Sequence, residues 1–584
     1  MRCFVAFALL SLISSLCTAQ PAAPGGSLKS RERIDRGVVA RPVDGGKIYV
    51  GWRLLELDPA ELAFNVYRRT GSAAPVKLNA EPIRQTTDFV DSQAAQGTEH
   101  AWFVRTVVGG REGPASPEAA ATPSEKALPY ISIKLDGNHT FQKVGIADLD
   151  GDGRYDFVVK QPHDNIDPYE RYWRRSPGTY KLEAYRHDGR FFWRVDLGWA
   201  IEQGIWYSPY VVYDLDGDGK AEVAVKTGEG DPRDTDGRVK TGPEYLTILD
   251  GPTGKPITRV DWPSREGFGN TPEKAYNHAC RNQLCVAYLD GKTPSLIVER
   301  GTYDIIKLVA YQLRDKKLQE VWRWDNSKEP KSYWGQGAHW MHAADIDGDG
   351  CEELILGSAV IDHNGKALWT TGLGHPDHSY VGKIDPDRPG LQIYYGIETK
   401  QKANGMCLVD AATGKILWGF DQPTRHVHSQ GLCSDIDPKH PGCEAYSADT
   451  DEKKAFKFGL MWDCHGQVIS REELCGFGPR TAYWDADPQR ELVNKDRIWK
   501  YQGPTLAPKI EGQLVAVADI LGDWREEIIT SLPGELRIYT TTIPATDRRV
   551  CLMQDPIYRI DVVCAAMGYY QVPMTSYDLA TGKR

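Results

Sequence analysis

A short acidic motif recurs along this chain of 584 residues, and each copy is followed by an apolar run. The three clearest copies place carboxylates at positions one, three, five and nine: Asp148, Asp150, Asp152 and Asp156; Asp214, Asp216, Asp218 and Glu222; Asp345, Asp347, Asp349 and Glu353. Carboxylate oxygens at this spacing can converge on one hard cation, and the glycines between them permit a tight turn, which suits Ca2+. The sequence therefore predicts several calcium ions, with acidic turns that bind no metal as the alternative.

The same motif continues in weaker form to the end of the chain. Further candidate ligands in these copies are Asp385, Asp435, Asp437, Asp519, Asp523 and Glu527. Position twelve of the clear copies is Val159, Val225 or Leu356 instead of the glutamate of an EF-hand, so the loops lead into strands. About eight units of roughly 35 to 75 residues indicate a repeat architecture. We predict an all-β fold with an eight-bladed β-propeller over residues 126–584, and two stacked all-β domains as the alternative.

Two further regions precede the repeats. Residues 30–125 contain strand-like runs at sandwich-like spacing and resemble a fibronectin type III β-sandwich. Residues 1–19 combine Arg2, a short apolar stretch and a small-residue cleavage pattern, which predicts a signal peptide. We therefore expect a secreted or periplasmic protein, and no later segment is long and apolar enough to span a membrane.

Composition narrows the classes of partner. The formal net charge of -10 argues against nucleic acid, because the protein and the phosphate backbone would repel each other. The 17 Trp and 28 Tyr could stack on sugar faces, although such residues also fill β-cores. We expect a polysaccharide partner and a monomeric protein.

Ten of the 12 cysteines follow the predicted signal peptide, and an exported protein could pair them. Candidate local disulfides are Cys433 with Cys443 and Cys464 with Cys475. Free buried thiols are the alternative, because sequence alone does not fix the pairing.

Histidines stand in pairs just before three successive acidic motifs. These residues are His339 and His342, His375 and His378, and His426 and His428. Equivalent positions of successive repeats tend to meet at one face, and imidazole is both a metal ligand and a base near neutral pH. We predict catalytic roles for His339, His375, His378, His426 and His428, with buried structural histidines as the alternative for any single one.

Four other residues are candidates for binding a sugar acid. Arg425 and Arg480 could bind a carboxylate through two parallel hydrogen bonds, with ordinary ion pairs as the alternative. Trp334 and Trp484 could form sugar-stacking walls, and core packing is the alternative reading.

Several motifs resemble the family 11 polysaccharide lyases, which are rhamnogalacturonan lyases. They include Lys226-Thr-Gly, Gly372-Leu-Gly-His375, Gly522-Asp-Trp-Arg-Glu-Glu and Asp555-Pro-Ile-Tyr-Arg559. The resemblance covers nearly the whole chain after the signal peptide. It implies an eight-bladed propeller that binds several calcium ions and cleaves the rhamnose–galacturonate backbone of pectin by β-elimination.

The chain departs from that family pattern at two positions where the family has a cationic residue. Glu511 stands where the family has a lysine that is favoured as the base, and Lys509 is the nearest remaining lysine. Gln430 stands where an arginine usually precedes glycine. We therefore expect histidine, or Lys509 after a change of the loop, to take over proton transfer.

Three function classes follow. The first is a calcium-dependent lyase acting on rhamnogalacturonan. The second is a propeller that binds glycan or protein without catalysis, because acidic-loop propellers also serve adhesion. The third is a glycoside hydrolase, which would need two carboxylates facing each other across the sugar.

Overall fold

The structure is a computed structural model that describes residues 32–584. It confirms the all-β prediction, because nearly all regular elements of the described chain are antiparallel strands. The predicted signal peptide, residues 1–19, lies outside the described residues. Among residues 32–584, no helix combines the length and apolar character needed to cross a membrane.

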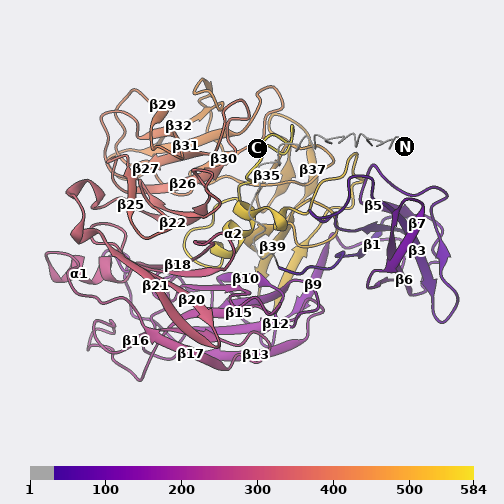
Figure 1. The fold of residues 1–584 in the computed structure, drawn as a ribbon, viewed down its shortest axis with the longest axis horizontal. Coiled ribbons are helices and arrows are strands. Elements are labelled where there is room, and N and C mark those ends of the chain that lie inside the picture. The colour runs from indigo at the N-terminus through magenta and orange to yellow at the C-terminus, as the bar shows by residue number, and fades with distance from the viewer. Residues whose placement is uncertain (1–31) are drawn as a thin grey trace, which may run out of the picture.

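The N-terminal region consists of two sheets that share a core. One sheet has the order β1 (Val39–Val43), β2 (Lys47–Gly51) and β5 (Asp88–Asp91). The other contains β3 (Ala63–Thr70), β4 (Val76–Lys77), β6 (His100–Val108), β7 (Arg111–Ala115) and β8 (Ala119–Ala121). Val50, Trp52, Phe64 and Trp102 of both sheets are fully buried in one cluster. Figure 1 shows this region, in dark purple, at the edge of the larger body of sheets.

The rest of the described chain forms eight four-stranded antiparallel sheets. The first four contain β10 (Lys143–Ala147), β11 (Asp156–Gln161), β12 (Lys181–Tyr185) and β13 (Phe191–Asp196); β14 (Tyr210–Tyr213), β15 (Glu222–Gly228), β16 (Glu244–Leu249) and β17 (Pro256–Asp261); β18 (Asn282–Ala287), β19 (Ser295–Arg300), β20 (Lys307–Arg314) and β21 (Lys317–Asp325); β22 (Gly337–Ala344), β23 (Glu353–Gly357), β24 (Ala359–Ile361) and β25 (Ala367–Thr370).

The next three sheets contain β26 (Pro376–Gly382), β27 (Gln392–Ile397), β28 (Met406–Asp410) and β29 (Ile416–Gly419); β30 (Leu432–Ser434), β31 (Glu444–Thr450), β32 (Phe456–Trp462) and β33 (Val468–Ser470); β34 (Arg480–Ala482), β35 (Glu491–Val493), β36 (Arg497–Trp499) and β37 (Thr505–Pro508). The last sheet joins β38 (Gln513–Ala518), β39 (Glu527–Leu532) and β40 (Glu535–Tyr539) to β9 (Tyr130–Lys134). Because β9 pairs with β40, the two ends of this region meet in one sheet.

A short buried helix, α2 (Pro556–Cys564), packs against the first strands of several sheets. It contacts β10, β14, β18, β22 and β38, and Figure 1 shows it among the sheets. Asp555 caps its N-terminus by accepting hydrogen bonds from the backbone of Ile557 and Tyr558, and Pro556 fits the first turn. The first strands of successive sheets also contact one another, as β18 does with β22 and β22 with β26. Residues at the ends of these first strands are therefore brought close together.

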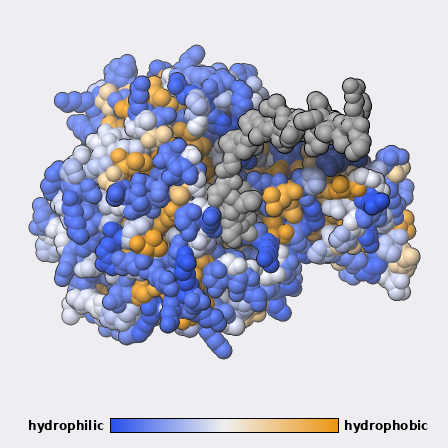
Figure 2. Space-filling model, in the orientation of Figure 1, coloured by the Kyte–Doolittle hydropathy of each residue, from blue (hydrophilic) through white to orange (hydrophobic). Residues whose placement is uncertain are grey.

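The other helical segments are short and lie outside the sheets: α1 (Pro272–Ala279), η1 (Asn326–Lys328), η2 (Lys331–Tyr333) and η3 (Leu552–Gln554). Figure 2 shows that the visible face is mainly hydrophilic, with apolar residues in separate spots.

At four of the contacts between neighbouring sheets, a tryptophan from the fourth strand of one sheet packs against the next sheet. The indole N–H groups of Trp193, Trp322, Trp369 and Trp418 donate to backbone carbonyls of the next sheet at 2.7–3.1 Å. Each ring also covers a glycine of that sheet; a Cβ at Gly414, for example, would lie 2.5 Å from the ring of Trp369. Three of these glycines stand in Thr-Gly-Lys or Asn-Gly-Lys turns, and the fourth, Gly466, stands in His-Gly-Gln. These turns therefore serve as docking points for the rings.

The predicted local disulfides are wrong. All ten cysteines of the described chain are free. Cys464 is buried and its thiol donates to the carbonyl of Pro441, whereas Cys475 is exposed on another loop. The thiols of Cys433 and Cys443 are neighbours, and the hydrogen bond with Cys433, together with burial, raises the pKa of the Cys443 thiol.

Candidate active site

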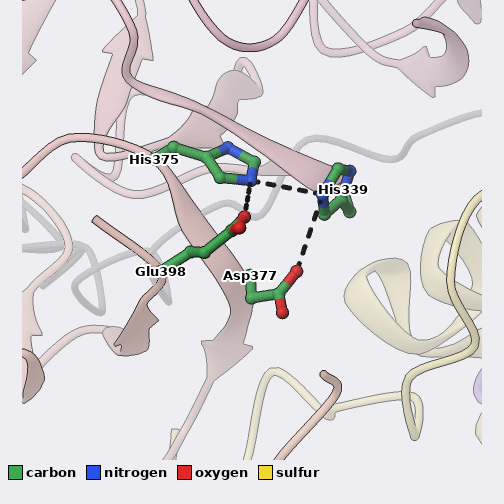
Figure 3. A group of neighbouring side chains, drawn as sticks. All are labelled: His339, His375, Asp377 and Glu398. Atoms are coloured by element: carbon green, nitrogen blue, oxygen red, sulfur yellow. Dashed lines mark hydrogen bonds and ion pairs between the residues drawn. The ribbon is translucent and has the colours of Figure 1, made fainter. Parts of the chain in front are cut away.

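Four of the predicted histidines meet at one end of two neighbouring sheets. His339 comes from β22 and His375 directly precedes β26, and their Nε2 atoms are 3.2 Å apart. Asp377 Oδ1 lies 3.5 Å from His339, and Glu398 Oε2 lies 3.0 Å from His375 (Figure 3). These four side chains, the histidine–carboxylate cluster, converge because the first strands of the two sheets pack together and Glu398 directly follows β27, the partner of β26.

His426 and His428 line the same cluster on its more exposed side. His428 Nδ1 is 3.0 Å from Asp377, His426 Nδ1 is 3.3 Å from Glu398, and His426 Nε2 is 3.1 Å from His428 Nδ1. The side chain of His428 is 38% exposed, whereas that of His339 is 3% exposed. The site is therefore a buried group of ligand-type atoms with two imidazoles at its opening.

Burial and the paired charges set the protonation of the cluster. Burial, aided by His375, lowers the pKa of His339 to about 3, so its imidazole is neutral. Burial opposes ionisation of Asp377, but the hydrogen bond from His428 and the nearby imidazoles hold its pKa below the usual range. The pKa of Glu398 is also lowered, because its bond to His375 outweighs burial. Neutral imidazole with ionised carboxylate is a ligand set for a divalent cation.

Aromatic side chains and one arginine form the wall beside His339. Trp206 and Tyr569 each pack on the His339 ring at 4.7 Å between centroids, and the hydroxyl of Tyr303 is 3.3 Å from His339 Nε2. Arg281 is held by two hydrogen bonds to Asp167 and lies over the rings of Trp206 and Tyr303. Tyr303 and Tyr569 are half-buried and supply flat surfaces of the kind on which sugars stack, whereas Trp206 is fully buried behind His339.

A polar chain leads from the cluster to a second arginine. The backbone N–H of Ser429 donates to Asp377, and the hydroxyl of Ser429 contacts Gln430 Oε1 at 2.8 Å. Gln430 Oε1 also accepts from Arg480 at 3.2 Å. Arg480, predicted as a substrate ligand, is thus linked to the site through two residues.

The remaining predicted site residues lie apart from the cluster. His378 is fully buried, with its ring nitrogens on the carbonyl of Ser429 and the hydroxyl of Ser447 at 2.7 Å. His342 is likewise bound by Asp561 and the carbonyl of Ser379. Lys509 is exposed and paired with Glu511 at 2.9 Å. The loop is not remodelled to bring its amine into the cluster.

The four arginine and tryptophan candidates differ in whether they are connected to the cluster. Arg425 is exposed, and its guanidinium donates to the carbonyl of Glu452. Trp484 is buried in the main core, so the Trp484 ring has no free face for a sugar. The neighbouring Tyr483 is also buried and packs against Trp524. Trp334 packs against a small cluster of Phe268, Ala279 and Ile305. Of the four, Arg480 is the one tied to the cluster.

Each acidic motif forms the turn between the first and second strand of a sheet. In the copy 214–222, Asp214 accepts from the backbone of Gly217 and Gly219, and Glu222 accepts from Leu215 at 2.9 Å. Burial is the main cause that raises the pKa of Glu222 to about 9. The copy 345–353 repeats these bonds, and burial raises the pKa of Glu353 to about 8.

The other copies differ in what faces their carboxylates. In the copy 148–156, Arg186 binds both Asp150 and Asp152. In the last copy, Arg525 and the hydroxyl of Tyr49 bind Asp523, one of the predicted metal ligands. Asp385 is paired with Arg388 at 3.0 Å.

Several buried carboxylate oxygens in these turns have no hydrogen-bond partner in the described chain. They belong to Asp150, Glu353, Asp435, Glu444, Glu491 and Asp519. Burial raises the pKa of Asp435 to about 8 and that of Glu444 well above its usual value. Buried, unpaired oxygens next to further carboxylates fit a hard cation, so the residues present are suited to calcium.

Sequence reasoning missed Glu398 altogether. Glu398 follows an apolar strand as many acidic residues do, and only the pairing of β26 with β27 brings it to His375. Asp377 carried a signal, since it stands two residues after His375 in a short polar motif.

Family comparisons cover almost the whole described chain. Residues 135–584 match the model for rhamnogalacturonan lyase family 11, C-terminal domain. Residues 29–122 match the model for the rhamnogalacturonan I lyases beta-sheet domain.

Individual relatives agree with these matches. The chain is 38% identical to the rhamnogalacturonan endolyase YesW of Bacillus subtilis, over 100% of this chain and 96% of the relative. It is 34% identical to the rhamnogalacturonan exolyase YesX of the same organism, over 95% of this chain and 96% of the relative. The crystal structure of YesW superposes with a TM-score of 0.84 over 94% of this chain and 97% of that one. That of a Bacillus licheniformis rhamnogalacturonan lyase gives 0.85 at 34% identity, over 95% and 98%. The chain belongs to rhamnogalacturonan lyase family 11.

Proposed function

We propose that this protein is a secreted, calcium-dependent lyase that cleaves the rhamnogalacturonan backbone of pectin by β-elimination at galacturonate. The histidine–carboxylate cluster carries the proposal, because His339, His375, Asp377 and Glu398 place four ligand-type atoms within reach of one ion. The family relationship supports the substrate class, since the relatives named above are rhamnogalacturonan lyases.

The proposed fold is an eight-bladed propeller with a fibronectin type III-like sandwich at its N-terminus, divided near residue 125. Eight four-stranded sheets, the pairing of β9 with β40 and the contacts of α2 with the first strands of five sheets support it. In such a ring the ends of the first strands line one mouth, which is where the cluster lies.

Calcium is proposed at two kinds of place. In the acidic turns 345–353 and 435–444, it would neutralise carboxylates with buried oxygens that lack hydrogen-bond partners. In the turn 214–222, it would neutralise Glu222, whose pKa burial raises to about 9. At the cluster, a bound cation would neutralise the galacturonate carboxylate and so acidify the C5 proton.

This chain's own residues would do the rest. Tyr303 and Tyr569 would orient the sugar ring over the cluster, and the buried Trp206 would hold His339 in place from behind. His426 and His428, at the opening, would move protons between the substrate and solvent. Arg480 would bind an oxygen of the substrate, because its guanidinium reaches the site through Gln430.

The test is product analysis on rhamnogalacturonan with matched variants. The wild-type protein should generate unsaturated uronate ends, followed as rising ultraviolet absorbance. Asp377→Asn should lower this rate by about 100-fold or more, a usual scale for loss of an electrostatic contact at the reacting group. Asp315→Asn, at the exposed tip between β20 and β21, is the matched control and should leave the rate unchanged.

Two outcomes would overturn the proposal. New reducing ends without ultraviolet absorbance would show hydrolysis. Binding of the glycan without either signal would show a non-catalytic binding protein.

A further inference from the structure

Three neighbouring cations, two of them buried and one half-buried, lie near the site without a carboxylate partner. Lys143 begins β10, Lys160 is its cross-strand partner in β11, and Arg480 begins β34. Within residues 32–584, none of the three forms an ion pair with an acidic side chain. Lys143 is 7% exposed and Lys160 is fully buried. Buried positive charge without a counter-charge is costly, so such a group points to an anionic ligand or to a neutral amine.

Their positions in the repeat place Lys143 and Arg480 on the same end of the sheets. Each stands five residues before the first aspartate of its acidic motif, and so does Gln430. Arg480 donates to Gln430, and Ser429 connects Gln430 to Asp377 of the cluster. A ligand at the cluster therefore lies beside this row of residues.

The hydrogen-bond partners of the three cations indicate different roles for them. The amine of Lys160 donates to the carbonyl and hydroxyl of Ser208, which holds it in a structural role. Arg480 lies over the ring of Tyr570 and donates to Gln430. In the part of the chain that the structure describes, the amine of Lys143 has no hydrogen-bond partner, so it is free to meet a substrate.

We propose that Lys143 is the general base that removes the C5 proton of galacturonate, with Arg480 beside it to bind the same sugar. This inference rests on the proposed lyase function. Burial, aided by the charge of Arg480, lowers the pKa of Lys143 to about 7, which leaves much of the amine neutral at physiological pH. The proposal places the general base on β10, whereas neither the histidine pairs nor Lys509 supplies one.

The step balances without any other reagent than water. The C5–H bond breaks and its proton goes to Nζ of Lys143, while its electron pair forms the C4–C5 double bond. The C4–O bond breaks, its electron pair leaves with the oxygen, and that oxygen takes a proton from water at the His426–His428 opening. Lys143 then returns its proton to solvent.

The experiment combines Lys143→Ala with rescue by small primary amines. The variant should lose about 100-fold or more in kcat, the usual scale for removal of a general base. Added methylamine or ethylamine should restore part of kcat in proportion to amine concentration, because a free amine can enter the space that the side chain leaves. A structural role of Lys143 would give no such rescue.

Two further variants keep the test decisive. Lys143→Arg preserves the charge and much of the length but cannot act as a base, so it should retain KM within a few-fold and lose kcat as Lys143→Ala does. It also serves if the alanine variant fails to fold. Lys134→Ala, on the exposed face of β9, controls for handling and should match the wild type.

The outcomes separate the two proposals. If the wild type produces no unsaturated uronate, the proposed lyase function fails. If the wild type does produce unsaturated uronate, two results would show that Lys143 is not the base. One is a Lys143→Ala variant that retains kcat, and the other is a variant that loses activity through KM alone and is not rescued by amines. A Lys143→Arg enzyme with wild-type kcat would overturn the assignment equally.

Discussion

At the scale of residues, the site is defined by side chains whose charges are mutually dependent. His339 stays neutral because it is buried beside His375, and Asp377 stays ionised because His428 donates to it against the cost of burial. The cluster is thus arranged as a ligand set before any ion arrives, which is the preorganisation that electrostatic catalysis requires.

The proposed metal role of the cluster predicts a change in the number of bound calcium ions. Glu398→Gln should reduce the number of calcium ions bound by one, because it replaces a carboxylate ligand by a weaker amide oxygen. Equilibrium dialysis followed by metal analysis would measure this, with Asp315→Asn as the control that binds the full number. An unchanged count in Glu398→Gln, together with wild-type affinity, would mean that no ion binds at the cluster.

The sequence showed the histidines of this site but not all their roles. The spacing of His339, His375, His426 and His428 before successive motifs was a sufficient signal, because equivalent positions in a repeat converge. The same spacing also selected His378, yet its neighbour Asp377 faces the cluster and alternation along β26 turns His378 away. Lys143 gave no signal, since a lysine at a strand end is ordinary until its burial is known.

At the scale of elements, the acidic turns carry an electrostatic cost in the absence of metal. Burial raises the pKa of Glu222 to about 9 and that of Glu353 to about 8, while both would titrate near ~4.3 in the unfolded chain. Between these pH values the folded protein binds more protons than the unfolded chain, so its free energy of unfolding falls as pH rises.

This sign gives a prediction for the chelated protein. Its Tm should be highest near about pH 5 and decline toward about pH 9, because the raised carboxyls lose their protons over that window. Saturating calcium should flatten the decline, since it stabilises the ionised carboxylates. Differential scanning calorimetry with and without calcium would test it, and equal pH slopes in both conditions would speak against metal in these turns.

The ring-on-glycine contact between sheets makes a second prediction at this scale. Gly414 has φ of 69° and Gly390 has φ of 70°, but only the first faces a ring. Gly390→Ala should cost about 1 kcal/mol from strain alone. Gly414→Ala should cost about 1–3 kcal/mol more, because Trp369 must move. Equal losses in chemical denaturation would show that the contact between the sheets is loose.

At the scale of the whole molecule, the N-terminal region is joined to the last sheet. Arg53, 1% exposed, donates to the carbonyl of Ile520 at 2.6 Å and lies 3.4 Å from Asp35. Tyr49 binds Asp523 at 2.8 Å. The acidic turn 519–527 therefore faces the N-terminal region as well as its own sheet.

Arg53→Ala should consequently lower the free energy of unfolding by roughly 2–4 kcal/mol, because buried acceptors lose their donor. It should also split one thermal transition into two, as the N-terminal region loses its attachment. Calorimetry would show the split. Retention of a single transition at the wild-type Tm would mean that Arg53 is not what joins the two parts.

Repeat number and fold class were readable from the chain because each acidic turn precedes an apolar strand. What the sequence could not show is which strands from distant positions pair, as β9 does with β40. It also could not show that Trp484 is buried, since strand aromatics face core or solvent according to register.

The most direct test of the whole account is a calcium titration of the chelated enzyme on rhamnogalacturonan, with ultraviolet absorbance of unsaturated uronate as the signal. We predict no increase in absorbance after chelation, full recovery on adding calcium, and no recovery in Asp377→Asn at the concentration that restores the wild type. Undiminished elimination by the metal-free protein would contradict the account.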